Sequence, residues 1–404
     1  MYYKRLIEEK IIQAIDMFKI LLVTGPRQVG KTTTLKHLFS DTYHYVTLDD
    51  ITELSVAKDD PKLFFMNHPL PIIIDEVQLA PSLFHEIKRL VDSSDLYGQI
   101  ILTGSQTFHL MDNITESLAG RIGILEFNGL SLREINKEIF NLPFIPNTSF
   151  LSVARQPFTF DLWEVIHRGS LPELYKKENI DWQLYYASYV RTYIERDVRS
   201  LINVKNLDLF SKFITSVAAR TATVINYSNI SKEIGVDIKT IQSWMKVLEA
   251  SGIVILIQPF SNNALKRVIE SPMLYFMDTG LVSYLLKWTT KDTLQNGAMS
   301  GPIIETFAVS EIVKSFKNSG INMMPIYFYR DKDMKEIDLI ISKDDRLYPI
   351  EIKKSMNPTK SMVKSFSVLK KALGFTVENE LILCLVENKI LIDITTIAFP
   401  IKSI

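Results

Sequence analysis

The stretch "ILLVTGPRQVGKTTTLKHLF", residues 20–39, decides the fold of the N-terminal third of this chain. Its first five residues have the apolar pattern of a buried strand, a glycine-containing loop follows, and helical spacing begins after the loop. Gly25, Gly30, Lys31 and Thr32 occupy the fixed positions of G-x-x-x-x-G-K-[ST], in the strand–loop–helix setting that this motif requires. The sequence therefore predicts a phosphate-binding loop (P-loop).

Each fixed position of the loop has a physical reason. Glycines let the backbone N–H groups face the phosphates, and the helix N-terminus adds the positive end of its dipole. Lys31 would neutralise the β- and γ-phosphates, and the Thr32 hydroxyl would ligate Mg²⁺. The predicted cofactors are ATP and Mg²⁺; an ordinary strand–helix turn with glycines is the alternative. The predicted nucleotide-binding residues are Gly25, Pro26, Arg27, Gln28, Val29, Gly30, Lys31, Thr32 and Thr33.

A second motif, "PIIIDEVQ" at residues 71–78, has an apolar run that ends in Asp75 and Glu76. We expect Asp75 to hold Mg²⁺ through water and Glu76 to polarise the attacking water. An apolar run that ends in two acids is common in α/β proteins. Beside a P-loop, however, it is typical of a Walker B strand.

Two further side chains are candidates for catalysis. The strand-like "QIILTGSQ" (99–106) ends near Ser105, which would be a sensor of the γ-phosphate or part of an ordinary turn. Arg121 opens the next strand and would reach the ATP of a neighbouring subunit as an arginine finger, or else pair with a local acid. The finger role would require a homo-oligomer.

Five strands that alternate with helices predict a parallel sheet covered on both faces. Ligands in such sheets bind at the carboxyl ends of the strands, where we expect all the residues named so far to lie.

The motifs "GPRQVGKTT", "DEVQ", "LTGSQ" and "SLAGR", in this order and spacing, resemble a prokaryotic AAA+ ATPase family whose members carry a C-terminal domain of unknown function. The resemblance continues through "HRGSLPELY" (167–175) and "YVRTYIERDV" (189–198) to about residue 360. It implies a P-loop sheet with an additional strand and Mg²⁺-dependent ATP hydrolysis. It implies no settled cellular role.

Bulk properties set limits on the remainder. A chain of 404 residues predicts two or three domains. Lys plus Arg and Asp plus Glu number 46 each, so net charge gives no hint of nucleic acid. The single cysteine, Cys384, excludes an internal disulfide and fits a reducing compartment. No apolar run approaches the roughly 18 residues of a membrane span, so we expect a cytoplasmic protein without a membrane partner.

The predicted fold class is α/β, with a P-loop sheet, a central helical and winged-helix region, and a C-terminal α/β domain of the restriction-endonuclease type. The expected boundaries are 1–140 for the ATPase domain, 141–220 for a linker and helical connector, 221–290 for the winged helix and 295–404 for the C-terminal domain.

Residues 226–260 predict a helix–turn–helix followed by a wing. We expect a short helix capped by Ser228 and ended near Gly235, then a longer helix that begins near Asp237 and stops at Gly252. DNA would be the partner of such a unit, although its nearly balanced charge also fits a packing or protein-docking module. The candidate DNA contacts are Lys239, Thr240, Gln242 and Ser243 on the second helix, with Lys266 and Arg267 on the wing.

Two strand-like runs in "EIDLIISKDDRLYPIEIKKS" (336–355) carry charges against their apolar pattern. Asp338 and Glu351 are thirteen residues apart, which suits adjacent antiparallel strands joined by a tight turn. The two carboxylates would then be close enough to share a metal ion. Lys353 follows on the same strand face and would orient or deprotonate a water.

This arrangement resembles the restriction-endonuclease-like core, the PD-(D/E)XK pattern of many DNA-cutting enzymes. The matching catalytic positions are Glu305 on an upstream helix, Asp338, Glu351 and Lys353, although no proline precedes the aspartate. A nuclease-like module that does not cut, or a plain edge hairpin with solvated charges, are the alternatives.

Two hypotheses follow for the whole chain. In the first, an ATPase drives a DNA-binding winged helix and a metal-dependent nuclease. In the second, a signalling or scaffolding NTPase uses its C-terminal modules to bind protein or DNA without cutting.

Overall fold

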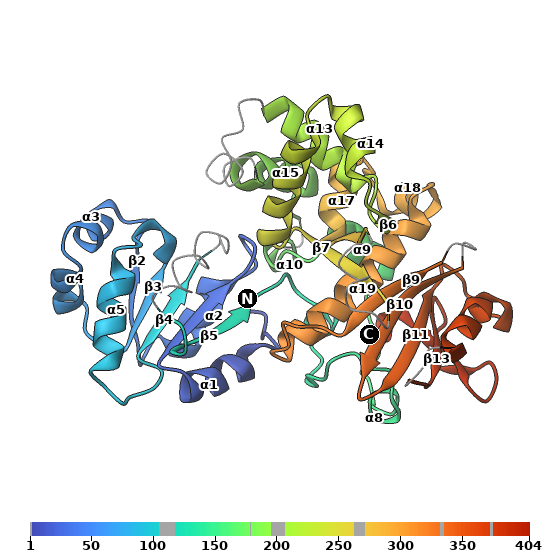
Figure 1. Ribbon diagram of the computed structural model, residues 1–404, viewed down its shortest axis with the longest axis horizontal. Coiled ribbons are helices and arrows are strands. Elements are labelled where there is room, and N and C mark those ends of the chain that lie inside the picture. The colour runs from blue at the N-terminus through green and yellow to red at the C-terminus, as the bar shows by residue number, and fades with distance from the viewer. Residues whose placement is uncertain are drawn as a thin grey trace.

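The computed structural model describes residues 2–104, 118–177, 179–194, 207–261, 271–331, 335–371 and 375–404. Two sheets organise them, one in the N-terminal third and one in the rest of the chain (Figure 1). The α/β fold class, with an N-terminal parallel sheet and a C-terminal α/β region, is confirmed.

The N-terminal sheet has five parallel strands in the order β2-β3-β4-β1-β5. β4 therefore lies between the P-loop strand β1 and the Asp75 strand β3, which is the additional strand that the family resemblance implied. The strands are β1 (Ile20–Thr24), β2 (His44–Thr47), β3 (Ile72–Asp75), β4 (Ile100–Thr103) and β5 (Ile122–Glu126).

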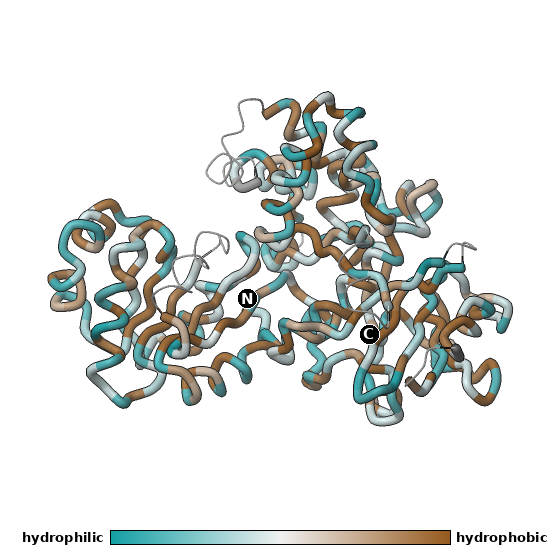
Figure 2. Tube along the Cα trace, viewed as in Figure 1, coloured by the Kyte–Doolittle hydropathy of each residue, from teal (hydrophilic) through white to brown (hydrophobic). Residues whose placement is uncertain are grey.

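Apolar residues on both faces hold this sheet between helices. β1, β3 and β4 are buried along their whole length, as expected for strands covered on both faces. Hydrophobic residues follow these strands in Figure 2. The helical segments of this part are α1 (Glu8–Met17), α2 (Lys31–Phe39), α3 (Ile51–Asp59), α4 (Pro61–Asn67), η1 (Val77–Leu79), α5 (Leu83–Asp92) and α7 (Leu132–Ile135).

The second sheet runs in the order β14-β15-β13-β11-β10-β9-β7-β8-β6, with β12 beside β11. Its strands are β6 (Thr223–Val224), β7 (Val254–Pro259), β8 (Met273–Phe276), β9 (Ile326–Arg330), β10 (Glu336–Lys343), β11 (Arg346–Ile352), β12 (Thr376–Val377), β13 (Glu380–Cys384), β14 (Ile390–Leu391) and β15 (Thr396–Pro400). The strand-like runs of the C-terminal tail thus extend the sheet, as predicted.

Helices cover and connect this second sheet. They are α8 (Thr148–Leu151), α9 (Leu162–Arg168), α10 (Glu173–Lys176), α11 (Trp182–Tyr189), η2 (Val190–Ile194), α13 (Leu207–Ala218), α14 (Tyr227–Ile234), α15 (Ile238–Ala250), α17 (Thr279–Leu285), α18 (Lys291–Asn296), α19 (Ser300–Asn318), η3 (Lys360–Lys371) and η4 (Ile401–Ser403). None of the helices in the described ranges combines the length and apolar character that crossing a membrane requires.

Strand β7 belongs to two structural units at once. It pairs antiparallel with β8 and parallel with β9, where Gln258 lies opposite Tyr327. The predicted helix–turn–helix region and the predicted C-terminal domain therefore share one continuous sheet. The boundaries expected between them remain predictions.

Two local expectations need correction. Asn226, and not Ser228, caps α14, because its side chain accepts a hydrogen bond from Asn229 N at 3.0 Å. Residues 141–180 are packed, although we expected them to begin as a linker: Phe144 and Phe150 are buried and both lie against Phe399 with ring centroids 6.5 Å apart. The sequence did not predict this packing, because the apolar residues of the segment contact several different neighbours and so follow no single helical or strand period.

Buried charges join the two parts of the chain at α7. Arg5 Nε lies 3.0 Å from Glu134 Oε1, and Lys314 Nζ lies 2.8 Å from Glu311 Oε1, with all four side chains almost fully buried. Glu311, on α19, also accepts a hydrogen bond of 2.6 Å from the backbone N–H of Leu132. The N-terminal sheet unit is thereby fixed to a helix that packs against the second sheet.

We expect Glu134→Ala to lower the free energy of unfolding by about 3–5 kcal/mol, because it leaves the buried Arg5 without its carboxylate. Glu134 also accepts hydrogen bonds from Leu6 N and Ser131 N. Urea unfolding followed by circular dichroism measures the change. The control is Glu173→Ala, which breaks an exposed pair with Lys176 and should cost less than about 1 kcal/mol. Equal costs for the two variants would contradict this account.

Candidate functional site

The P-loop connects the end of β1 to the start of α2, and its glycines are required by sterics. Gly25 has φ +135°, and a Cβ there would lie 2.2 Å from the carbonyl oxygen of Phe127. Gly30 has φ +97° at the N-cap of α2. Both backbone conformations are accessible to glycine and strained for other residues, so the loop can take the shape that phosphate binding needs.

Thr32 and Asp75, the two predicted Mg²⁺ ligands, lie together. Thr32 Oγ1 donates a hydrogen bond of 2.9 Å to Asp75 Oδ2. The ammonium group of Lys31 donates to Gly25 O and Pro26 O, each at 2.8 Å, and so lies within the loop. A hydroxyl and a buried carboxylate at one point suit a hard cation such as Mg²⁺, which prefers oxygen ligands. The residues present therefore fit the ion.

Two orienting residues of Asp75 were missed from the sequence. Tyr45 donates to Asp75 Oδ2 at 2.8 Å, and Thr103 donates to Asp75 Oδ1. Thr103 is the last residue of β4, which pairs with the Asp75 strand. Its position at the end of a predicted strand could have indicated that it lies near Asp75. Tyr45 lies inside the short edge strand β2, and only the strand order places it beside Asp75.

Glu76 follows Asp75 in a left-handed backbone conformation, φ +56°. Its carboxylate accepts a hydrogen bond from the side chain of Gln78. Burial raises the pKa of Glu76 above its ordinary value, while the Gln78 bond and the charges of Arg27 and Lys31 oppose that rise. A base that holds its proton more tightly accepts one from water more readily.

Not every predicted residue lies at this edge of the sheet. Arg121 precedes β5 and therefore lies at the amino ends of the strands, which corrects our expectation that all named residues lie at the carboxyl ends. Its guanidinium group pairs with Asp92, with Nε 2.5 Å from Oδ1. This is the local-acid alternative, and the finger role in a neighbouring subunit stays a prediction. Ser105 lies outside the described residues.

The P-loop also contacts the middle of the chain. A Cβ at Gly252, just after α15, would lie 2.9 Å from Pro26 Cγ, so the proline ring packs closely against the Gly252 backbone. Tyr185 on α11 donates a hydrogen bond of 2.5 Å to Gln28 Oε1. Arg5 donates to Val29 O at 2.6 Å. Three separate segments thus touch the loop that would hold the phosphates.

A second cluster of charge forms where β10 and β11 pair. The strands are antiparallel, with Lys343 opposite Arg346, and the two-residue turn between them has positive φ at Asp344 and Asp345, as a type I′ turn requires. The predicted hairpin is confirmed. Asp338 consequently lies against the end of β11 and accepts a hydrogen bond of 2.7 Å from Ile352 N.

Lys353 joins the two predicted carboxylates. Its Nζ lies 2.6 Å from Glu351 Oε1 and 3.3 Å from Asp338 Oδ2, and both acids are buried. Burial alone would lower the pKa of Lys353, but the two carboxylates outweigh it and raise the pKa. The lysine therefore supplies the positive charge that two neighbouring buried acids require.

Burial raises the pKa of all three acids of this cluster. The pKa of Glu351 rises to about 8, with the charge of Asp338 as the second cause. The pKa of Asp338 also rises, against the opposing effect of Lys353. The pKa of Glu305 rises well above its ordinary value, with Asp338 again contributing. The three predicted acids thus form one electrostatic cluster.

Tyr275 was missed by the sequence analysis. It lies on β8, is fully buried, and donates a hydrogen bond of 2.7 Å to Glu305 Oε1. No motif marks it, because β8 reads as an ordinary apolar strand. We name the set Glu305, Asp338, Glu351, Lys353 and Tyr275 the carboxylate cluster.

One oxygen of the carboxylate cluster is unsatisfied. Glu351 Oε2 is buried and has no hydrogen-bond partner among the described residues. An unpaired buried oxygen beside a second carboxylate fits a divalent cation with oxygen ligands. Within the described ranges, however, no group of three or more acidic, histidine or cysteine side chains is arranged to hold a metal ion. A metal here would need further ligands, such as water.

The predicted DNA-contacting residues of α15 differ in their surroundings. Lys239 and Gln242 are exposed. The Thr240 hydroxyl donates to the N-capping Asp237 at 2.6 Å, so that side chain serves the cap of the helix. Lys266 and Arg267 lie outside the described residues.

Comparisons with known proteins divide the chain into three matched segments. Residues 17–136 match a family model described as an AAA domain. Residues 159–292 and 300–404 match two models described as domains of unknown function, DUF8612 and DUF4143. The AAA match covers the sheet and the P-loop described above, so the N-terminal part is an AAA-type P-loop ATPase domain that uses ATP.

Two curated relatives match this chain over most of its length. An uncharacterized protein of Mycobacterium tuberculosis and one of Mycobacterium bovis are each 27% identical over 356 residues, which is 87% of this chain and 74% of theirs. Among solved structures, a Walker-type ATPase of Pyrococcus abyssi is 14% identical, with a TM-score of 0.39 over 70% of this chain and 96% of its own. A RuvB variant of Thermotoga maritima is 12% identical, with a TM-score of 0.31 over 65% and 94%.

We expect Glu351→Gln to remove a pH dependence of stability. The folded-state pKa of Glu351, about 8, lies above its ordinary value of 4.5, so the folded chain binds this proton more tightly than the unfolded chain. Its stabilising contribution is complete below about pH 4.5 and is lost as pH rises to about 8, on the order of a few kcal/mol. Unfolding free energies measured across this range test it. Glu378→Gln, which changes the acid paired with Arg346, is the control; a Glu351→Gln variant that keeps the wild-type slope would contradict the assignment.

Proposed function

We propose that the chain is a Mg²⁺-dependent ATPase that controls a DNA-binding helix–turn–helix and a metal-dependent nuclease site. The observation that carries the ATPase part is the contact of Thr32 with Asp75 beside Lys31 in the P-loop. Mg²⁺ held by Thr32 and Asp75 would supply positive charge to the β- and γ-phosphate oxygens. Tyr45 and Thr103 fix the orientation of Asp75.

Glu76 is the residue proposed to activate water. It adjoins Asp75, and Gln78 holds its carboxylate. The amide of Gln78 would orient the carboxylate toward a water in line with the γ-phosphate, and Glu76 would take the proton as the water attacks. The raised pKa of Glu76 favours this transfer.

Contacts of the P-loop support coupling to the rest of the chain. Nucleotide binding must rearrange Lys31, which bonds Gly25 O and Pro26 O, and Pro26 lies against Gly252 at the end of α15. Movement of Pro26 would therefore act on the second helix of the helix–turn–helix. The exposed Lys239 and Gln242 near the start of that helix are the proposed DNA contacts, with Ser243 beside them.

The carboxylate cluster is the proposed nuclease site. Asp338 and Glu351 would hold a divalent cation, with Glu305 nearby, and the orphaned Glu351 Oε2 favours this assignment. A cation would supply charge to a scissile phosphate. Lys353, whose Nζ lies beside both acids, would be the group that orients the attacking water.

A specific observation favours a second candidate function. Lys353 already neutralises Asp338 and Glu351, so the cluster is satisfied electrostatically except for one oxygen. In that case the C-terminal region would bind protein or DNA without cutting, and the chain would be a signalling or scaffolding NTPase.

We expect Lys31→Ala to abolish ATP binding, because the β- and γ-phosphates lose their counter-charge. Glu76→Gln should still bind ATP but hydrolyse it about 100-fold more slowly or worse. Calorimetric titration and a phosphate-release assay measure the two effects. The exposed Lys58→Ala and Glu9→Gln are matched controls and should behave as wild type. Wild-type affinity in Lys31→Ala would refute the P-loop assignment.

We expect plasmid cleavage in Mg²⁺ or Mn²⁺ by wild type but not by Asp338→Asn or Lys353→Ala, because each change removes one member of the carboxylate cluster. Gel analysis with and without ATP measures it. Lys343→Ala, at the exposed end of the same strand pair, is the control.

Equal inertness of all these proteins would favour the scaffold. DNA binding measured against salt concentration then distinguishes a DNA partner from a protein partner. An affinity for DNA that falls steeply with rising salt indicates contacts with the DNA phosphates. An absence of DNA binding even at low salt would leave protein docking as the remaining role.

A further inference from the structure

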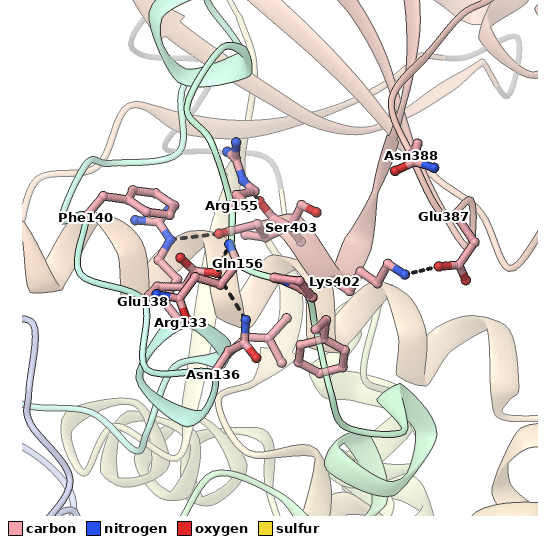
Figure 3. A pocket seen from close by; sticks show the side chains of 14 residues that line it. Arg133, Asn136, Glu138, Phe140, Arg155, Gln156, Glu387, Asn388, Lys402 and Ser403 are labelled. Atoms are coloured by element: carbon pink, nitrogen blue, oxygen red, sulfur yellow. Dashed lines mark hydrogen bonds and ion pairs between the residues drawn. The ribbon is translucent and has the colours of Figure 1, made fainter.

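One group of polar side chains outside the two candidate sites lines a cavity of about 420 Å³ beside α7 (Figure 3). Arg133 there donates to Ile404 O at 2.8 Å, and Lys402 pairs with Glu387. These groups are engaged within the chain, and we assign the cavity no ligand. Another polar group lies at the outer edge of the N-terminal sheet, where two histidines face each other.

His44 and His68 meet through their ring nitrogens. His44 opens the edge strand β2, and His68 is the C-cap residue of α4. His44 Nε2 lies 2.9 Å from His68 Nδ1, and the ring centroids are 5.1 Å apart with 25° between the ring planes. The centroid separation exceeds the N···N distance by nearly the two centre-to-nitrogen distances of imidazole rings. The rings therefore meet edge to edge, and the in-plane directions of the two nitrogens converge.

Glu53 determines which nitrogen of His68 faces His44. His68 Nε2 donates a hydrogen bond of 2.7 Å to Glu53 Oε2, so the neutral ring carries its proton on Nε2 and a lone pair on Nδ1. Phe64 packs against the same ring with centroids 4.7 Å apart, and the His68 side chain is only 12% exposed. Histidines that bind metals in proteins are typically oriented by a carboxylate in this way. The ring of His68 is thus held in place for coordination through Nδ1.

His44 can supply a second nitrogen ligand. Its side chain is exposed, and its Nδ1 has no hydrogen-bond partner in the part of the chain that the structure describes. The ring proton can therefore move from Nε2 to Nδ1, which leaves lone pairs on both facing nitrogens and releases no proton. Metal–nitrogen bonds of about 2.0–2.1 Å in a tetrahedral site place two ligand nitrogens roughly 3.3 Å apart. The two rings would have to separate by only a few tenths of an ångström.

We propose that His44 and His68 bind a divalent transition-metal ion such as Zn²⁺, with Glu53 as the residue that orients His68. Imidazole nitrogens suit Zn²⁺ and Cu²⁺, whereas Mg²⁺ prefers oxygen ligands. Within the described ranges, no group of three or more histidine, cysteine or acidic side chains is arranged to hold a metal ion, so water would complete the coordination.

A bound ion would join the end of α4 to the strand that supports the ATPase site. Tyr45, the residue of β2 that follows His44, donates to Asp75 Oδ2 at 2.8 Å. Successive side chains of a strand point to opposite faces, so His44 can bind a metal at the surface while Tyr45 contacts Asp75. The ion would therefore restrain β2 without entering the nucleotide site.

Calorimetric titration of the full chain with Zn²⁺ tests the site, in excess Mg²⁺ to occupy sites made of oxygen ligands. We expect a saturable Zn²⁺-binding event that raises Tm, because an ion that binds the folded state stabilises it. His44→Gln and His68→Gln should each lose this event, and Glu53→Gln should weaken it about tenfold or more. His85→Gln, which changes an exposed histidine on α5, is the matched control and should keep it.

Electron paramagnetic resonance of bound Cu²⁺ identifies the ligands, because the P-loop and the carboxylate cluster contain no histidine. We expect coupling to two imidazole nitrogens in wild type and in His85→Gln, and to at most one in His68→Gln. Both measurements are made well below Tm, so a less stable variant is still compared as folded protein. Zn²⁺ binding that is absent from wild type, or that is equal in wild type and His44→Gln, would overturn the proposal.

Discussion

The buried guanidinium group of Arg5 is the interaction on which the arrangement of this chain depends. It pairs with Glu134 at the start of α7 and donates to the backbone of the P-loop at Val29 and of the β5 exit at Asn128. A charge taken out of water is tolerated only where its hydrogen bonds are complete. Separation of the P-loop backbone at Val29, the β5 exit or α7 from Arg5 would leave part of its guanidinium group unpaired, so Arg5 opposes separation of these three segments.

The two candidate sites use charge in opposite ways. At the P-loop, the ammonium group of Lys31 donates to the backbone carbonyls of Gly25 and Pro26, inside the loop that would hold the phosphates. In the carboxylate cluster, Lys353 is already paired with Glu351 and Asp338. The first arrangement is prepared for an anion. In the second, a metal ion would have to replace the ammonium group of Lys353 beside the two acids. Because burial raises the pKa of Glu351, the ionisation of Glu351 depends on which cation lies beside it.

Local patterns predicted the strands and motifs well, and long-range pairing explains what they missed. The P-loop strand, the Asp75 strand and the β10–β11 hairpin each depend on a short stretch of sequence whose periodicity and turn residues are sufficient. The parallel pairing of β7 with β9 joins residues about seventy positions apart, and no local pattern encodes it. Tyr275 and Arg5 were missed for the same reason, because their partners Glu305 and Glu134 are identified only by the folded arrangement. Arg121 was assigned to the wrong edge of the sheet. It precedes β5, and a residue that precedes a parallel strand lies at the amino end of that strand.

The shared strand β7 has a mechanical consequence. α15 runs through Gly252 into β7, and β7 is hydrogen-bonded on one side to β8, which carries Tyr275, and on the other to β9, which pairs with the Asp338 strand. Only Ser251, Gly252 and Ile253 separate the end of α15 from the start of β7. The helix is thus connected through one short segment and a continuous set of paired strands to the elements that carry Tyr275 and Asp338.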